Sequence, residues 1–175
     1  MIRNRIAAFA CALLWGSLLV GTAASEWQAC SDPRFQFVLQ YPPGLVHSRD
    51  PGTSACSFKT PDAEFSVEAV LQPDAANSGD TLEARYQKEL DLLGGTVTYK
   101  RKAETWFVLS GVTPDGTEFY RKQYTKGSKW IALRMTYPHA RNEKYSPWVT
   151  RIEKTFVPFA TRDRVEGDEP ESSRD

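Results

Sequence analysis

The residues best suited to covalent chemistry in this chain are one serine and two histidines. Ser110 precedes Gly111 where a predicted strand ends, and the two available imidazole bases are His47 and His139. A serine hydroxyl becomes a nucleophile only when a base activates it, whereas a Ser-Gly pair at a strand end is a common turn. The chain contains no phosphate-loop, dinucleotide-binding, zinc-protease or α/β-hydrolase motif. We therefore predict no catalytic residue, and a small exported hydrolase with an unmarked site is the alternative.

Metal ligands are equally sparse. A zinc site needs three or four protein ligands, and two lone histidines do not supply them. The segment 74–80 has side chains suited to a calcium loop, but it lacks an acid at the third position and a distal bidentate glutamate. Its last residue, Asp80, fits better as the N-cap of a following helix. We expect no metal ion and no cofactor.

The first 25 residues have the pattern of an export signal. Arg3 and Arg5 precede the uncharged apolar run 6–20, and the small residues 21–25 supply a peptidase site. Cleavage would give a periplasmic or secreted chain, whereas retention would leave an N-terminal anchor as its one membrane contact. The rest has the composition of one globular domain, which we assign to 26–159, and a polar tail at 160–175 that is predicted to be disordered.

The cysteine count follows from this export prediction. Cleavage would remove Cys11 and leave Cys30 and Cys56. An even number of cysteines in an oxidising compartment predicts a disulfide, and two buried thiols are the alternative. The spacing is too wide for a C-x-x-C redox pair.

Hydrophobic periodicity predicts the elements that would position these residues. Apolar alternation or turn residues mark early strands at 35–41, from 45, at 55–59 and at 64–72, and a helical repeat follows over 80–93. Later strands are predicted at 96–102, 105–110, 117–125 and 130–137, linked by turns at 113–116 and 126–128. Ser146 and Pro147 would begin a last helix. We predict an α+β fold with a single antiparallel sheet, an early β-meander, one crossover helix and a C-terminal helix, both helices packed on one face.

Charge is distributed unevenly along the chain. Segment 26–95 has five basic and eleven acidic residues, whereas 100–144 has ten basic and four acidic residues. If both helices cover one face, the other face carries cations and aromatics that could hold an anionic partner. The plainer alternative is an ordinary solvated sheet face. The candidate binding residues are Lys100, Lys102, Arg121, Lys122, Tyr124, Lys129, Trp130 and Arg134.

The order of elements resembles the PsbP-like family. An opening strand that ends in Tyr41-Pro42-Pro43-Gly44, an early meander, one amphipathic helix, a long-hairpin sheet and a closing helix are similar to photosystem II extrinsic subunits, a eukaryotic Ran-binding protein and bacterial periplasmic proteins. The resemblance covers about 33–158. It implies a non-catalytic module that docks on a larger assembly, and it transfers no metal-binding residues. We expect a monomer that docks on an envelope protein or complex and does not bind nucleic acid. A carrier of an anionic or lipid ligand is a further alternative.

Overall fold

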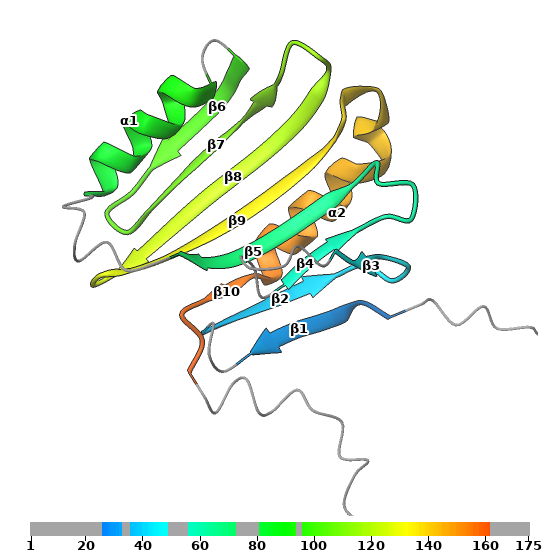
Figure 1. Cartoon of the computed structure of the whole chain (residues 1–175), viewed down its shortest axis with the longest axis horizontal. Helices are drawn as coiled ribbons and strands as arrows, with labels where there is room; N and C mark the ends of the chain where they lie inside the picture. Colours follow the sequence, from blue (N-terminus) through cyan, green and yellow to red (C-terminus); the bar gives the residue numbers. More distant parts are fainter. Residues whose placement is uncertain (1–25, 33–35, 49–55, 73–80, 94–95, 162–175) are drawn as a thin grey trace, which may run out of the picture.

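The computed structural model describes residues 26–32, 36–48, 56–72, 81–93 and 96–161 (Figure 1). The predicted export signal, the Asp80 cap, the 74–80 segment and nearly all of the predicted tail lie outside these residues. The described elements are, in chain order, β1 Gln28–Asp32, β2 Phe37–Tyr41, β3 Val46–His47, β4 Cys56–Lys59, β5 Ser66–Gln72, α1 Leu82–Leu93, β6 Val97–Lys102, β7 Trp106–Val112, β8 Thr117–Lys126, β9 Lys129–Pro138, a 3-10 turn His139–Arg141, α2 Asn142–Thr155 and β10 Val157–Pro158.

The α+β class is confirmed, but the single sheet is wrong. The strands form a seven-stranded sheet in the order β3-β4-β5-β9-β8-β7-β6 and a three-stranded sheet in the order β1-β2-β10. The reason lies in β2, where Phe37, Val38 and Leu39 are all buried. Three consecutive buried residues need cover on both faces of a strand. Phe37 and Leu39 pack into the main core, whereas Val38 packs with Val157 and Ala160 on the other side.

The hairpin half of the large sheet follows the predicted order. Strands β6 to β9 are antiparallel neighbours, and β9 also pairs with β5 along seven residues, with Val67 opposite Met135. Gly116 and Gly127 occupy the two predicted turns with φ values of 81° and 61°, a region that glycine enters without a Cβ penalty. The chain thus crosses from β5 through α1 to the far edge and returns strand by strand.

The two helices lie on opposite faces of the large sheet, which corrects the prediction of one shared face. Successive side chains of a strand point to opposite sides. On β8, Phe119 packs in the cluster of α1, whereas Tyr120 and Tyr124 pack in the cluster of α2. Figure 1 shows α1 beside β6 and β7 and α2 behind β5 and β9. Each helix therefore covers one end of one face.

The helix termini differ from the predicted ones. Thr81 caps α1, because its Oγ1 accepts a hydrogen bond from Ala84 N–H at 3.1 Å. The predicted start of α2 at Ser146 is wrong, since the helix begins at Asn142 and Pro147 lies inside it. A proline there removes one helical hydrogen bond. The anchor that holds this turn is Tyr145, which is fully buried beside Phe65 at 5.3 Å between ring centroids.

The predicted disulfide is confirmed. Cys30 of β1 is bonded to Cys56 of β4, and this bond joins the small sheet to the large one. Ala160, which the sequence assigned to the tail, is buried, and its N–H donates to Gln36 O at 2.7 Å. Within the described part of the chain, no helix is long and apolar enough to cross a membrane.

Candidate binding cleft between α2 and the sheet

A cleft of about 450 Å³ opens where α2 stops covering the sheet. One wall is the side of β6, β7 and β8 that faces α2, and the other wall is α2 itself. The sheet wall is aromatic and cationic, whereas the helix wall carries small hydroxyls, one valine and one carboxylate. We call this the α2 cleft, and it is lined by Tyr99, Arg101, Trp106, Val108, Tyr120, Lys122, Ser146, Val149, Thr150 and Glu153.

Strand register explains why these side chains meet. Arg101 lies opposite Val108, and Val108 lies opposite Lys122 on the next strand. Residues directly opposite one another in a sheet point to the same face. Tyr99, Ser110 and Tyr120 are opposite one another in the same way, two residues along each strand, and so lie on the same face. Three consecutive hairpin strands therefore place two cations and three aromatic rings on one face.

Both cations of the cleft contact the ring of Trp106. Arg101 Cζ lies 5.6 Å from its ring centroid, and Lys122 Nζ lies 4.5 Å from the same centroid. A cation within about 6 Å of an indole face is attracted by the ring quadrupole. Cations from the strands on either side thus hold Trp106, half-buried, at the mouth of the cleft.

The inner part of the cleft holds an ion pair whose cation is largely buried. Lys122 Nζ pairs with Glu153 Oε1 at 2.7 Å, and the Lys122 side chain is only 11% exposed. Burial raises the pKa of Tyr120 far above its usual value, and the nearby Glu153 carboxylate raises it further. The same two causes raise the pKa of Tyr124. Both phenols stay protonated and neutral throughout the physiological range.

The outer part of the cleft carries charge that no described residue balances. Arg101 is exposed and forms no ion pair with any described acidic side chain. Its strand neighbour Tyr99 is 51% exposed, which makes it one of three large apolar or aromatic side chains exposed in the described chain. The cleft therefore offers a guanidinium that has no acidic partner among the described residues, and Tyr99 and Trp106 line the same cleft.

The eight candidate binding residues predicted from sequence do not share one face. Lys122 lies in the cleft. Tyr124, on the same side of β8, packs on Phe156 with 5.7 Å between the ring centroids. Lys129 also lies on the α2 side, where its Nζ donates to Gln36 Oε1 at 3.0 Å. By strand alternation the other five lie on the α1 side: Lys100, Lys102, Arg121, Trp130 and Arg134.

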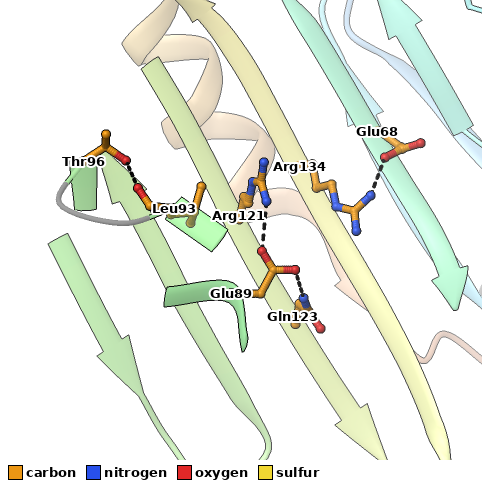
Figure 2. A network of polar contacts seen from close by, with 7 residues as sticks. All are labelled: Glu68, Glu89, Leu93, Thr96, Arg121, Gln123 and Arg134. Atoms are coloured by element: carbon orange, nitrogen blue, oxygen red, sulfur yellow. Dashed lines mark hydrogen bonds and ion pairs between the residues drawn. The ribbon is translucent and has the colours of Figure 1, made fainter. Parts of the chain in front are cut away.

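Two of the candidates on the α1 side, Arg121 and Arg134, form ion pairs with other elements of the fold (Figure 2). Arg121 Nη1 pairs with Glu89 Oε2 at 2.9 Å, and Glu89 Oε1 accepts from Gln123 Nε2 at 3.0 Å. Arg134 lies opposite Arg121 on the neighbouring strand and pairs with Glu68 at 3.3 Å. These carboxylates hold α1 and β5 against the centre of the sheet.

The other three predicted binding residues on the α1 side differ in their surroundings. Lys102 pairs with Glu83 of α1. Trp130 is 2% exposed and lies under Arg85, whose Cζ is 4.3 Å from the ring centroid. Lys100 is exposed and has no ion-pair partner among the described residues. Sequence reasoning did not select Arg101, because only its register with Val108 puts it in the cleft.

The residues considered for covalent chemistry lie apart. His47 is on β3 with its ring 5.1 Å from Phe58, at the opposite edge of the sheet from β6. His139 Nδ1 contacts Glu118 Oε1 at 2.7 Å. Among the described residues, no hydrogen bond joins Ser110 to either histidine. The described part of the chain also contains no group of three or more His, Cys, Asp or Glu that could hold a metal.

Comparison with known proteins identifies the fold. No protein-family model and no curated protein matches the chain. The chain is similar to the solution structure of cyanobacterial PsbP (CyanoP) from Synechocystis sp. PCC 6803, with a TM-score of 0.54 and 12% identity over 79% of this chain and 96% of that one.

Two weaker similarities involve other bacteria. A Pseudomonas aeruginosa protein of unknown function, described as a putative regulator, matches with a TM-score of 0.46 and 14% identity over 77% of this chain and 99% of that one. A Bacteroides thetaiotaomicron structure matches with a TM-score of 0.43 and 16% identity over 70% of this chain and 45% of that one. The PsbP similarity has a TM-score above 0.5, and by it the chain has a PsbP-like fold.

Proposed function

We propose that this protein is an exported, non-catalytic binding module that docks on an acidic segment of an envelope protein or complex through the α2 cleft. The single observation that carries the proposal is Trp106 held between Arg101 and Lys122 at an open cleft. Aromatic and arginine side chains are the residues most enriched at protein interfaces. The Cys30–Cys56 disulfide supports export, because such bonds persist in oxidising compartments.

The distribution of charge supports an acidic partner. Lys122 already has a carboxylate partner in Glu153, whereas Arg101 has none among the described residues. An incoming carboxylate could therefore pair with Arg101 without displacing an internal ion pair. A guanidinium is also weakly hydrated and binds carboxylates in a bidentate manner, so it suits an interface.

The packing beneath α2 favours docking over the two alternatives. A lipid carrier would need an apolar cavity between the sheet and α2. That space is filled by the fully buried Phe65, Tyr145 and Ile152. Trp148 also packs against Phe65, with 5.3 Å between the ring centroids. A hydrolase would need converging polar groups at the site. The polar groups of the cleft are instead an internal ion pair, one arginine, the indole N–H of Trp106 and the hydroxyls of Tyr99, Tyr120, Ser146 and Thr150, and no nucleophile-and-base pair is among them.

The test is capture of partners by the tagged mature chain from its native envelope after mild crosslinking, with identification by mass spectrometry. Arg101→Glu is the informative variant, because Arg101 is exposed and its reversal breaks no ion pair with a described residue. Reversal of Arg121 or Lys122 would break the pairs with Glu89 and Glu153 and would confuse folding with binding.

The matched control is Lys59→Glu, which makes the same change of charge on β4, an exposed position far from the cleft in strand order. We expect the wild type and Lys59→Glu to capture the same partner and Arg101→Glu to lose it. Equal capture by all three chains would contradict docking at the cleft. Turnover of a substrate that depends on cleft residues would favour the hydrolase instead.

A further inference from the structure

The strand β6 lines the α2 cleft and is an edge strand of the large sheet in the described part of the chain. β6 is the last strand of the seven-stranded sheet, so its other edge has no strand partner among the described residues. Residues 98–102 are all exposed. An unpaired edge presents a row of N–H and C=O groups to which another extended segment can bind.

The register shows which backbone groups point outward. Ala103 N–H donates to Trp106 O at 2.8 Å, so the amide of Ala103 points toward β7. Orientation alternates along an antiparallel strand. Arg101 therefore also bonds toward β7, whereas the N–H and C=O groups of Lys100 and Lys102 point away from the sheet. The pairing with β7 is regular over Tyr99–Lys102. The outward backbone groups of Lys100 and Lys102 therefore have the spacing that an added antiparallel or parallel strand needs.

The side chains of β6 give this edge a strong charge. Lys100, Arg101 and Lys102 are consecutive, and two of them, Lys100 and Arg101, have no acidic partner among the described residues. Their alternation puts positive charge on both faces of the edge. A second copy of the same edge would bring like charges opposite one another, which is destabilising. An acidic strand is attracted on both faces.

We infer that β6 accepts an extended acidic segment of the partner as an additional strand of the sheet. The inference rests on the proposed function, since Tyr99 and Arg101 belong both to β6 and to the α2 cleft. Side chains of the added strand that face the α2 side lie beside Tyr99 and Arg101. Those that face the α1 side lie beside Lys100 and Lys102. The backbone supplies affinity, and the alternating side chains supply selectivity for acidic residues.

Lysines on an edge strand also protect a sheet against unwanted pairing. This protective role predicts that β6 binds no strand at all, whereas strand addition predicts binding that depends on backbone N–H groups. A test must therefore separate the backbone contribution from the charge.

The binding test uses a fluorescent peptide of alternating glutamate and valine as long as β6, with two N-methylated twins that block the N–H groups of one peptide edge each. The three peptides have the same charge. We expect the parent and one twin to bind equally and the other twin to bind about tenfold more weakly, because its methyl groups remove the hydrogen bonds to β6. Equal binding of both twins would overturn strand addition.

A pair of variants tests the same point from the protein side. Lys100→Gln removes the charge and keeps the outward N–H, whereas Lys100→Pro removes both. Proline is tolerated at an edge position whose N–H faces away from the sheet. We expect Lys100→Pro to bind the peptide about tenfold more weakly than Lys100→Gln, as the missing donor implies. Unchanged near-ultraviolet circular dichroism checks that both variants fold.

Amide hydrogen exchange gives a direct readout that does not depend on any variant. Peptide binding should slow exchange at the Lys100 and Lys102 amides and leave the Arg101 amide, already bonded to β7, unchanged. Binding without this protection would overturn strand addition. No peptide binding would also overturn it, whereas the docking proposal would still stand if Arg101→Glu loses partner capture and Lys59→Glu keeps it.

Discussion

Breaking the Cys30–Cys56 disulfide should lower the stability of the fold by a calculable amount. The bond closes a loop with a sequence separation of 26 residues. In the chain-entropy model, closing such a loop raises the free energy of the unfolded state by about 3.5 kcal/mol at 25 °C, and breaking the bond removes that contribution to stability. A domain has a total free energy of unfolding of roughly 5–15 kcal/mol. Reduction should therefore remove a substantial part of the stability without abolishing the fold.

The assay is urea unfolding of the mature chain, followed by tryptophan fluorescence, in its oxidised and reduced forms. A Cys30→Ala, Cys56→Ala double variant serves as the control, because it should respond in the same way with and without reductant. Cys56 is fully buried, so the double variant should be somewhat less stable than the reduced wild type through lost packing.

The position of the disulfide makes a second outcome part of the same prediction. The bond joins β1 to β4, whereas the peptide site is β6, at the far edge of the large sheet. Peptide binding at β6 should therefore be the same for oxidised and reduced protein wherever both are folded. A difference in unfolding free energy below about 1 kcal/mol would refute the entropic reasoning. Loss of peptide binding in folded, reduced protein would show that the two sheets are coupled.

Two further predictions concern the sheet itself. Gly111→Ala should destabilise the protein by about 3 kcal/mol or more in urea unfolding, since a Cβ there would lie 1.9 Å from the backbone oxygen of Thr96. Ser110→Ala, next to it, should change stability little, and a mild effect of Gly111→Ala would contradict the close approach. Because the pKa of Tyr120 and that of Tyr124 are raised in the folded state, the unfolded state loses protons first above pH 10. Each tyrosine thus lowers stability by about 1 kcal/mol per pH unit there, because its phenol is half ionised in the unfolded state at about pH 10 and almost fully ionised by about pH 11.5. Replacement of either tyrosine by phenylalanine should reduce the fall of the unfolding free energy with pH by that amount between pH 10 and 11.5. Parallel curves of unfolding free energy against pH for the wild type and the variant would refute this prediction.

Local pattern was enough to predict the elements whose boundaries depend on neighbouring residues. The helix that became α1, the two glycine turns and the four hairpin strands follow from periodicity and turn chemistry. The disulfide prediction followed from counting the cysteines that would remain after cleavage of the predicted export signal. In each case the information lies within a short segment or in composition, so no tertiary contact was needed to read it.

The strands β1 and β10 were not predicted, because each forms only against β2. Val157 and Pro158 are a two-residue strand that pairs with Val38 and Phe37. So short a segment has no periodicity of its own, and its pairing is a long-range contact. The start of α2 at Asn142 was missed for a similar reason. Ser146 and Pro147 have the local pattern of a helix N-terminus, whereas the first turn of α2, before them, is held by the long-range packing of the buried Tyr145.

The sequence alone determined that β8 is a strand with cations and aromatics, but only the tertiary structure decided which of them can meet a partner. Both faces of β8 have the same kinds of residue: an aromatic ring and a cation on each side, Phe119 with Arg121 and Tyr120 with Lys122. Alternation separates these two sets without saying which helix covers either one. That choice comes from long-range packing, which puts α1 on one face and α2 on the other and leaves Arg101 and Trp106 at the uncovered end.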